Sequence, residues 1–450
     1  MERISSEAML RFVERLERED VCLHGFELRQ DGEIRAEGYY APFAKGQPHR
    51  MYSVSKSMVA LALGLLLGEG RLRLTDHIVD FFPEALPAAP DPRLLRMTIE
   101  DMLRMTTCYR RTTYREGVDQ DWAATFFRGD CTHEPGTLFH YDTSCTQVLG
   151  ALCQRVSGQG LLELLEERIF HPIGATDPKR WLTDPSGVPQ GGTGLIMSLR
   201  DLGKTAQLVM DGGRGLLPES FLRSATAKQV DTTVQGNPEE RFGYGWQYWR
   251  TRRGWAMYGM GGQLAVACPA EGLLLCTIAD TRLDPYGVQR IYDAFFEEIV
   301  AAPGTEHDGD AQRLERKLAA LRVGGVPCRK ELPWNFAPRY GMGPNELGLA
   351  EVDMRPGALT LRWNAGGEDT FQWDTFGQVR QGVFARYNEP CLVSAGMVGE
   401  NMLRVRCHLI GDAPCGMDMR FALRNGRLSV ELKRSTDPKT QGYDGIAASP

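Results

Sequence analysis

One stretch limits the choice of fold more than any other: Met58–Leu67 is apolar on every side of the helix that its residues favour. A helix of that kind is buried on all its faces, so other parts of the chain must surround it. The stretch is far shorter than the ~20 residues that a membrane-spanning helix needs. The chain has 450 residues, of which 42% are hydrophobic and 24% charged. This size and composition are typical of a globular protein with two or three domains.

Charge and cysteine usage narrow the class of protein. Lys and Arg number 52, and Asp and Glu number 58, which gives a net charge of −6. There is no basic block that could follow a phosphate backbone, so we expect no nucleic-acid partner. Residues 1–20 are charged and lack the apolar core of a signal peptide. The eleven cysteines are scattered without a CxxC, which indicates reduced thiols in a cytoplasmic protein that binds no membrane.

The N-terminal part predicts a helix and a hairpin, followed by a helical region. The helix is expected over Ser5–Arg18, and strand-like runs follow over Val21–Arg29 and Glu33–Tyr39. Asp31-Gly32 between the two runs is a strong hairpin signal. Helix-like spacing then recurs over Met58–Gly68, Thr98–Met105, Thr146–Val156, Leu161–Ile169 and Leu199–Met210.

Strand-like runs return after the helical region, over Gly245–Arg250, Gln263–Cys268 and Leu273–Ala279, and a helix is expected over Gly287–Val300. Two strands before the helical insertion and three after it predict one antiparallel sheet of about five strands. We expect the first and last helices to pack together on one face of this sheet. The helical insertion would then form a second lobe, with a cleft between the lobes.

The C-terminal part alternates apolar and polar residues, as strands do. Alternating apolar positions run over 403–409, 417–423 and 428–432, and Asn425-Gly426 favours a tight hairpin turn between the last two runs. We therefore divide the chain into residues 1–303, a linker with a short helix over 304–329, an all-β barrel or sandwich over 330–435, and a flexible tail over 436–450.

Ser53 and Lys56 lie where the buried helix is expected to begin. Residues three apart share a helix face, with Cβ atoms roughly 5–6 Å apart, so the hydroxyl and the amine would meet. Burial and the helix dipole both disfavour a lysine cation, which eases the loss of its proton. A serine beside a potential base is what covalent catalysis requires. S-x-x-K is a common pattern, however, and by itself it is better explained as an N-cap serine followed by a solvated lysine.

Two further stretches favour a catalytic role for Ser53 and Lys56 over the N-cap explanation. Glu134–Thr143 forms a turn at Pro135-Gly136 and presents Tyr141 on the loop before the next helix. Tyr258–Gln263 has the sequence Tyr-Gly-Met-Gly-Gly-Gln and opens a strand. Its glycines allow another backbone to approach closely, as the edge of an active site needs.

Together the three stretches resemble the serine β-lactamase and penicillin-binding-protein superfamily on its class C side, which includes carboxylesterases, D-aminopeptidases, D,D-peptidases and amide-oligomer hydrolases. Three more elements occur in the family's order: Gly68-Glu69-Gly70 with Leu72–Pro83, Gly191–Asp201 and Gly243–Trp246. S-x-x-K is weak alone, but the ordered set is specific. The resemblance covers roughly residues 5–300 and implies a two-lobed α/β (α+β) fold, an antiparallel sheet flanked by helices plus a helical lobe. The all-β barrel-like domain follows it.

The resemblance also implies roles for individual residues. Ser53 would be the nucleophile and Lys56 its neighbouring base or proton carrier. Tyr141 matches the tyrosine of the second motif, a general base or acid in this family. A Tyr–Lys pair this close titrates as a unit, so which of the two is the base stays open. The oxyanion hole would use the backbone N–H groups of Ser53 and Gln263.

Four residues of the second and third motifs are expected to line the substrate site: Thr143, Met260, Gly261 and Gly262. Two of them depart from the family pattern. Thr143 stands where the second motif usually has asparagine, and its one hydroxyl replaces an acceptor and two donors. Met260 stands where the third motif usually begins with Lys or His, and it cannot bind a carboxylate. A neutral ester or amide is therefore the expected substrate, in place of the anionic substrates of β-lactamases and D,D-carboxypeptidases.

The sequence thus predicts a serine hydrolase of the esterase, amidase or D-amino-acid peptidase type that forms an acyl-enzyme on Ser53. Its expected partner is a small-molecule ester or amide, and a homo-oligomer formed through the C-terminal domain is a further possibility. The eight histidines show no H-E-x-x-H and no other metal-like spacing, so we expect no metal and no cofactor. The alternative, favoured by Thr143 and Met260, is a catalytically inactive β-lactamase-like binding protein.

Overall fold

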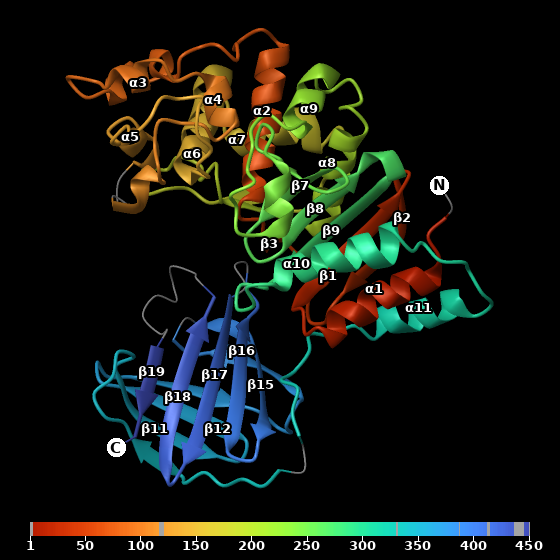
Figure 1. The fold of residues 1–450 in the computed structure, drawn as a ribbon, viewed down its shortest axis with the longest axis vertical. Helices are drawn as coiled ribbons and strands as arrows, with labels where there is room; N and C mark the ends of the chain where they lie inside the picture. The colour runs from red at the N-terminus through yellow and green to blue at the C-terminus, as the bar shows by residue number, and fades with distance from the viewer. Residues whose placement is uncertain are drawn as a thin grey trace. The chain divides into compact units, whose positions relative to one another are not determined.

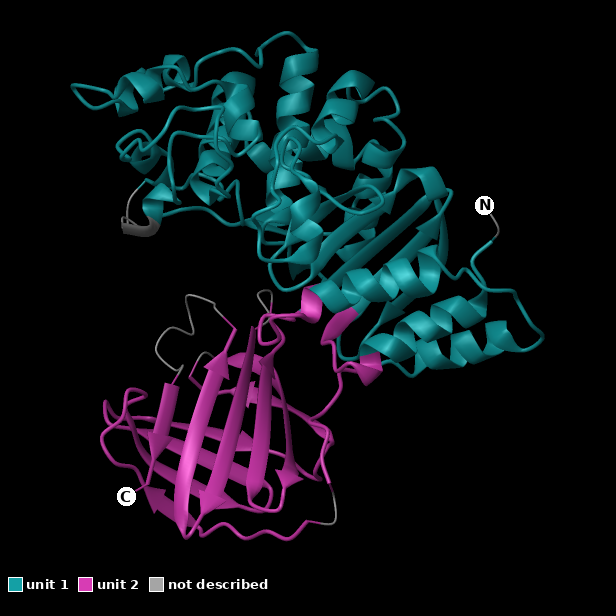
Figure 2. Ribbon diagram, viewed as in Figure 1, with its two compact units in different colours: residues 1–16, 25–279, 289–321 teal, residues 17–24, 280–288, 322–450 magenta. Residues whose placement is uncertain are grey.

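The computed structural model describes residues 3–116, 121–329, 332–386, 388–411, 415–435 and 445–449. The chain forms two compact units (Figure 1, Figure 2). Unit 1 comprises residues 1–16, 25–279 and 289–321, and unit 2 comprises residues 17–24, 280–288 and 322–450. The short helix expected in the linker is α11 (Asp310–Ala319), which belongs to unit 1. Within the described ranges no helix combines the length and the apolar character that crossing a bilayer demands.

Unit 1 is built on a six-stranded sheet in the order β2-β1-β9-β8-β7-β6. The pairs β1–β2, β6–β7, β7–β8 and β8–β9 are antiparallel. The strands are β1 (Leu23–Gln30), β2 (Glu33–Tyr39), β6 (Trp249–Arg250), β7 (Trp255–Gly259), β8 (Gln263–Cys268) and β9 (Leu273–Ala279). The bounds of β2, β8 and β9 are those that the sequence predicts.

The sheet has one strand more than the five expected. The sequence pattern does not reveal β7, because a short and almost fully buried strand lacks the alternation that marks a half-buried one. In addition, the strand expected over Gly245–Arg250 is reduced to β6. Gln247 has a φ of +66°, which breaks extended geometry just before Trp249.

Helices cover both faces of this sheet (Figure 1). Successive side chains of a strand point to opposite faces, and β1 shows this directly. Phe26 packs against Phe12 of α1 (Ser6–Arg18), with ring centroids 5.6 Å apart. Its neighbour Glu27 lies on the other face, against α8 (Leu199–Met210).

The last helix expected in unit 1 forms α10 (Gly287–Ala294) and continues as a π-helical turn over Phe295–Val300. It packs against α1, as predicted: Arg11 pairs with Glu298 at 3.1 Å and Arg15 pairs with Glu297 at 2.7 Å.

The segment between β2 and β6 is largely helical, as the sequence predicts. Its helices are α2 (Val54–Gly68), α3 (Pro92–Leu95), α4 (Ile99–Leu103), α5 (Trp122–Phe126), α6 (Thr143–Ser157), α7 (Leu161–Leu165), α8 and α9 (Glu219–Thr226). Every residue of α2 from Val54 to Leu66 is buried, which confirms that this helix is surrounded. A small sheet of β3 (His49–Arg50), β5 (Leu195–Met197) and β4 (Arg180–Trp181) was not predicted.

Unit 2 is strand-rich, with two sheets that share one hydrophobic core. One sheet consists of β10 (Arg339–Gly341), β11 (Leu349–Arg355), β12 (Ala358–Trp363) and β13 (Glu368–Gln372). The other consists of β14 (Val379–Phe384), β15 (Glu389–Gly399), β16 (Met402–Leu409), β17 (Cys415–Arg424), β18 (Arg427–Arg434) and β19 (Gly445–Ala448). Asn425 and Gly426 form the predicted turn, with φ of +52° and +78°.

Of the two alternatives expected for this domain, a barrel or a sandwich, the barrel is wrong, because the described strands form two open sheets and no closed barrel. The sequence could not decide this point, since barrels and packed pairs of sheets both alternate apolar and polar residues with a period of two. The expected tail also differs in part. Residues 445–448 form β19, which pairs antiparallel with β18, whereas residues 436–444 lie outside the described ranges.

Candidate active site

Ser53 lies in a strained turn immediately before α2. Tyr52 has a φ of +46°, in the left-handed region that a non-glycine residue rarely adopts. Such residues persist only where neighbouring structure holds them, and they cluster at functional sites. Here the Met51 N–H donates to Leu195 O at 2.8 Å, and Ser55 Oγ donates to Tyr52 O at 2.6 Å. The turn therefore holds Ser53 at the positive end of a buried helix.

The Ser53 hydroxyl faces Lys56. Within α2, whose residues are all described, it makes no capping hydrogen bond to the backbone. It instead accepts a hydrogen bond from Lys56 Nζ at 3.0 Å. The same nitrogen donates to Gly192 O at 2.8 Å and to Thr143 Oγ1 at 3.3 Å. The structure thus brings serine and lysine together as the i, i+3 spacing predicts, and it engages the hydroxyl with the amine.

Lys56 is 1% exposed. Burial lowers its pKa to about 7, because an ammonium ion is poorly solvated in the interior, and the negative charge of Asp142 opposes this effect only in part. A substantial fraction of the Lys56 side chains is therefore neutral at physiological pH. A neutral amine within hydrogen-bond distance of a serine hydroxyl can accept the proton of that hydroxyl.

Tyr141 completes the group. Its ring centroid lies 5.0 Å from Lys56 Nζ, and its hydroxyl is close enough to Ser53 for that side chain to lower the Tyr141 pKa. The ring stacks on Trp249 at 5.5 Å and meets Tyr244 edge-on at 6.3 Å. Burial raises the pKa of Tyr141 above its ordinary value, and the nearby Ser53 side chain offsets this only in part. The phenol is therefore protonated at neutral pH and can serve as a proton donor.

The start of α6 positions both Tyr141 and Thr143. Asp142 is the N-cap of this helix, and its Oδ1 accepts from the Ser144 N–H at 2.8 Å. The Thr143 N–H donates to Thr112 Oγ1 at 3.1 Å. Because the capping residue separates the two side chains in sequence, one helix end directs both of them toward Lys56.

The β7–β8 hairpin brings the third motif to the same turn. A Cβ atom on Gly259 would lie 2.1 Å from Met51 O, so only glycine allows this approach. For Gly259, the prediction that a glycine of this stretch permits close backbone contact is confirmed. Gly261 and Gly262, with φ of +88° and +94°, form the tip, and the Gln263 side-chain amide donates to Met260 O at 3.0 Å. The hairpin contacts the chain two residues before Ser53.

Two residues that contact the site are not among those that the sequence predicts: Gly192 and Trp249. Gly192 supplies the carbonyl that accepts from Lys56, and a Cβ there would lie 2.5 Å from Thr143 Cγ2. The adjacent pair Gly191-Gly192 was a usable signal, because it permits close approach of the backbone. Trp249 supports the Tyr141 ring. Its aromatic character alone was more simply explained as core packing, and no local signal marked its role.

A family model described as Beta-lactamase matches residues 26–286, more than half of the chain. This chain belongs to the Beta-lactamase family. The matched segment contains the residues that the structure brings together, namely Ser53, Lys56, Tyr141, Thr143 and Gly192. Membership confirms the resemblance that the three motifs indicate.

Several relatives illustrate the family. The chain is 27% identical over 210 residues to the 6-aminohexanoate-dimer hydrolase of Paenarthrobacter ureafaciens, covering 43% of this chain and 54% of that protein. It is 22% identical over 265 residues to esterase EstB of Burkholderia gladioli, covering 45% and 67%. It thus spans about half the length of the first of these curated relatives.

A solved structure shows the same fold at low identity. The octameric penicillin-binding protein homologue from Pyrococcus abyssi matches with a TM-score of 0.51 and 15% identity, covering 98% of this chain and 99% of that one. Both of these named curated relatives are hydrolases.

Proposed function

We propose that this protein is a serine hydrolase that cleaves a small ester or amide through an acyl-enzyme on Ser53. One observation carries the proposal: Lys56 Nζ lies 3.0 Å from Ser53 Oγ at a buried position. An activated serine needs an adjacent group that can take its proton. Because the amine donates to Gly192 O and Thr143 Oγ1 as well, its position is set before a substrate arrives.

Within this proposal Lys56 acts as the base and Tyr141 as the acid. The directions of the two pKa shifts support the division, since burial lowers the pKa of Lys56 and raises that of Tyr141. Met260 stands where a second cation would lower the pKa of the phenol, which favours the neutral form of Tyr141 further. The two groups are close enough to titrate as a pair, so the measured pKa values belong to the pair.

Each proton that the site takes up during one turnover is also released, so the catalytic groups return to their starting protonation states. Neutral Lys56 takes the Ser53 proton as Oγ bonds to the substrate carbonyl carbon, and the backbone N–H groups of Ser53 and Gln263 stabilise the oxyanion. Tyr141 then donates its proton to the leaving group as the scissile bond breaks, and it recovers a proton from Lys56. Water attacks the acyl-enzyme with the same groups as base and acid, which releases the carboxylic acid and free Ser53.

The third motif favours a neutral substrate. Met260 is 37% exposed at the hairpin that approaches the Ser53 turn, and its thioether offers no charge to a substrate carboxylate. Gly261 and Gly262 beside it leave room for the substrate backbone or acyl chain. The similarity to a 6-aminohexanoate-dimer hydrolase and to an esterase supports small amides and esters as the substrate class.

Labelling with a fluorophosphonate probe tests the nucleophile directly. The expected result is one adduct, located on Ser53 by peptide mapping, and loss of labelling in Ser53→Ala. Ser57→Ala is the matched control, since Ser57 lies on the same helix but donates to Gln247 O, away from Lys56. It should still be labelled.

Hydrolysis assays distinguish this proposal from a non-catalytic binding protein. Wild type and Ser53→Ala are compared on p-nitrophenyl esters and aminoacyl anilides. Activity that Ser53→Ala abolishes supports the proposal. Activity that survives the substitution contradicts it, and a fully folded wild type that shows neither labelling nor turnover favours a binding protein.

A further inference from the structure

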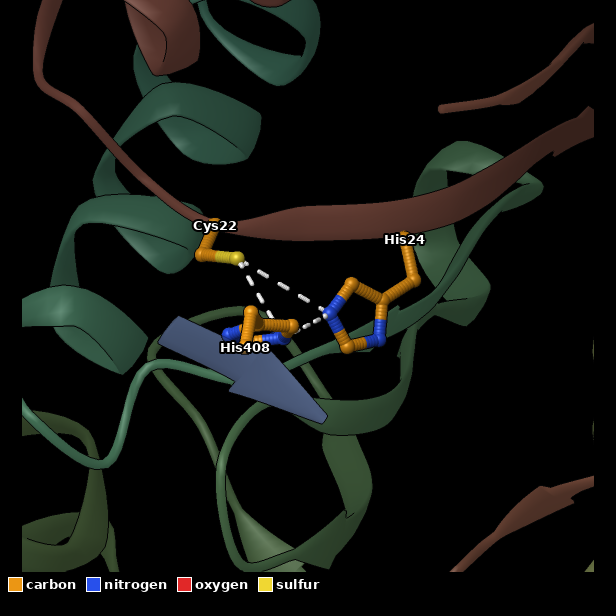
Figure 3. A group of neighbouring side chains, drawn as sticks. All are labelled: Cys22, His24 and His408. Atoms are coloured by element: carbon orange, nitrogen blue, oxygen red, sulfur yellow. Dashed lines mark hydrogen bonds between the residues drawn. The ribbon is translucent and has the colours of Figure 1, made fainter. Parts of the chain in front are cut away.

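Unit 2 brings together three side chains from two segments that lie far apart in the chain: Cys22 and His24 from one, and His408 from the other (Figure 3). Cys22 and His24 belong to the segment 17–24 of this unit, and His408 lies on β16. The two Nε2 atoms are 2.9 Å apart, and Cys22 Sγ lies 3.8 Å from each of them. Three potential metal-ligating atoms therefore form one small triangle.

The triangle has the dimensions of one face of a tetrahedral zinc site. With Zn–N of about 2.0 Å and Zn–S of about 2.3 Å, tetrahedral angles place the nitrogens about 3.3 Å apart and the sulfur about 3.5 Å from each. The corresponding distances here are 2.9 Å and 3.8 Å. Shifts of a few tenths of an ångström, on the order of 0.4 Å at most, would convert one arrangement into the other.

Asp280 lies beside His408, on the side of the ring away from Cys22 and His24, where a carboxylate could orient the imidazole. Its Oδ2 is 3.9 Å from His408 Nδ1, while its Oδ1 accepts from Arg282 Nε at 2.7 Å. Oδ2 is buried and has no hydrogen-bond partner among the described residues. A carboxylate on this side favours the proton on Nδ1, which leaves the Nε2 lone pair of His408 directed at Cys22 and His24.

The local backbone supports the same arrangement. The Asp280 N–H donates to Cys22 O at 3.0 Å, so the segment with Cys22 is tied to the residue that orients His408. His24 and His408 are 0% and 4% exposed, and Cys22 is half-buried. Buried imidazoles need partners for their ring nitrogens. A metal ion would satisfy both Nε2 atoms and the thiolate at once.

We propose that Cys22, His24 and His408 form a mononuclear Zn²⁺ site in unit 2, with Sγ and the two Nε2 atoms as ligands and water in the fourth position. Imidazole and thiolate are ligands for zinc, whereas Mg²⁺ and Ca²⁺ prefer oxygen. The ion links the segment 17–24 to β16, and the site is separate from the proposed serine chemistry. Sequence spacing predicts no metal, because 384 residues separate His24 from His408.

Binding of Zn²⁺ at the proposed site releases a proton from Cys22. A cysteine that holds no metal is largely a thiol at neutral pH, since its ordinary pKa is about 8.5. Coordination of Zn²⁺ displaces the proton of the Cys22 thiol, because the thiolate and the neutral imidazoles are the forms that bind the ion, and no redox step is involved.

Co²⁺ substitution tests the site in the tag-free, full-length protein after removal of metal with a chelator. The expected result is one Co²⁺ per chain, with a near-ultraviolet thiolate-to-cobalt charge-transfer band and strong visible bands of tetrahedral cobalt. Zn²⁺ should displace Co²⁺ and raise the unfolding temperature of the metal-free protein. Cys22→Ser should lose the charge-transfer band, and Asp280→Asn should weaken binding about 10-fold to 100-fold. Cys328→Ser, another half-buried cysteine of unit 2, is the matched control.

The wild-type spectrum decides the question without reliance on the folding of any variant. Failure to bind one Co²⁺ or Zn²⁺ per chain would overturn the proposal. The distance of 2.9 Å between the two Nε2 atoms would then reflect a hydrogen bond between His24 and His408. A charge-transfer band that persists in Cys22→Ser and disappears in Cys328→Ser would likewise overturn it. Fluorophosphonate labelling of Ser53 in the metal-free protein reports independently on the proposed hydrolase.

Discussion

Replacing Lys56 by arginine separates the positive charge of this side chain from its capacity to accept a proton. Burial lowers the pKa of Lys56 to about 7, so about half of these side chains are neutral at pH 7. A lysine in water, with a pKa of about 10.4, is neutral in about one molecule in 2,500 at that pH. The site therefore supplies about a thousandfold more free amine than a solvated lysine would. Arginine, which stays protonated, supplies none.

The expected loss in Lys56→Arg follows from the role of the amine. General-base catalysis contributes about 10²-fold to 10⁴-fold to a rate, so kcat/KM for a p-nitrophenyl ester should fall by a factor in that range. Lys204→Arg is the control, because Lys204 is a partly exposed lysine of α8 that pairs with Asp201. That variant should keep wild-type activity.

The pH dependence has a definite sign. Protonation removes the base, so wild-type kcat/KM should be low in acid, rise with pH through a midpoint of about 7, and then level off. The assay is initial-rate hydrolysis of a p-nitrophenyl ester over the range in which the protein stays folded. A level profile, a rise only in strongly alkaline solution, or undiminished kcat/KM in Lys56→Arg would refute the assignment of Lys56 as the base.

Three further substitutions test the surrounding geometry. Gly259→Ala places a Cβ 2.1 Å from Met51 O, so the hairpin must move, and a displacement of about 1 Å should slow fluorophosphonate labelling about 100-fold; an unchanged labelling rate would contradict this. Tyr141→Phe removes the proton donor, so hydrolysis of alkyl esters should slow far more than that of p-nitrophenyl esters, whose leaving group needs no proton; equal losses would argue against an acid role. Thr143→Val removes a hydrogen bond that stabilises the Lys56 ammonium, so the midpoint of the pH profile should move to lower pH; a shift upward would contradict it.

Much of the fold follows from signals that act within a few residues. Helix α8 begins where Ser198 Oγ accepts from the Asp201 N–H at 3.2 Å, a cap written in the local sequence. The turn at Asn425-Gly426 needs two consecutive residues with positive φ, which these two types adopt most easily. Such elements could be predicted because the interactions that form them lie between near neighbours in the chain.

Other features of the fold depend on partners that are distant in sequence. Strand β7 is almost fully buried, so its residues show no alternation, and its identity comes from pairing with β6 and β8. The choice between a barrel and two open sheets depends on which strand edges pair, and the apolar pattern of a single strand does not record that choice.

The contacts in the two proposed sites also differ in whether the sequence alone determines them. The pairing of Ser53 with Lys56 was determined by the sequence alone, because three residues of helix bring their side chains onto one face. The Gly192 carbonyl, the Trp249 ring and the triangle of Cys22, His24 and His408 were decided only by the tertiary structure. The physical reason is that helix and strand geometry reaches over a few residues, whereas contacts between remote segments exist only once the packed cores hold those segments together.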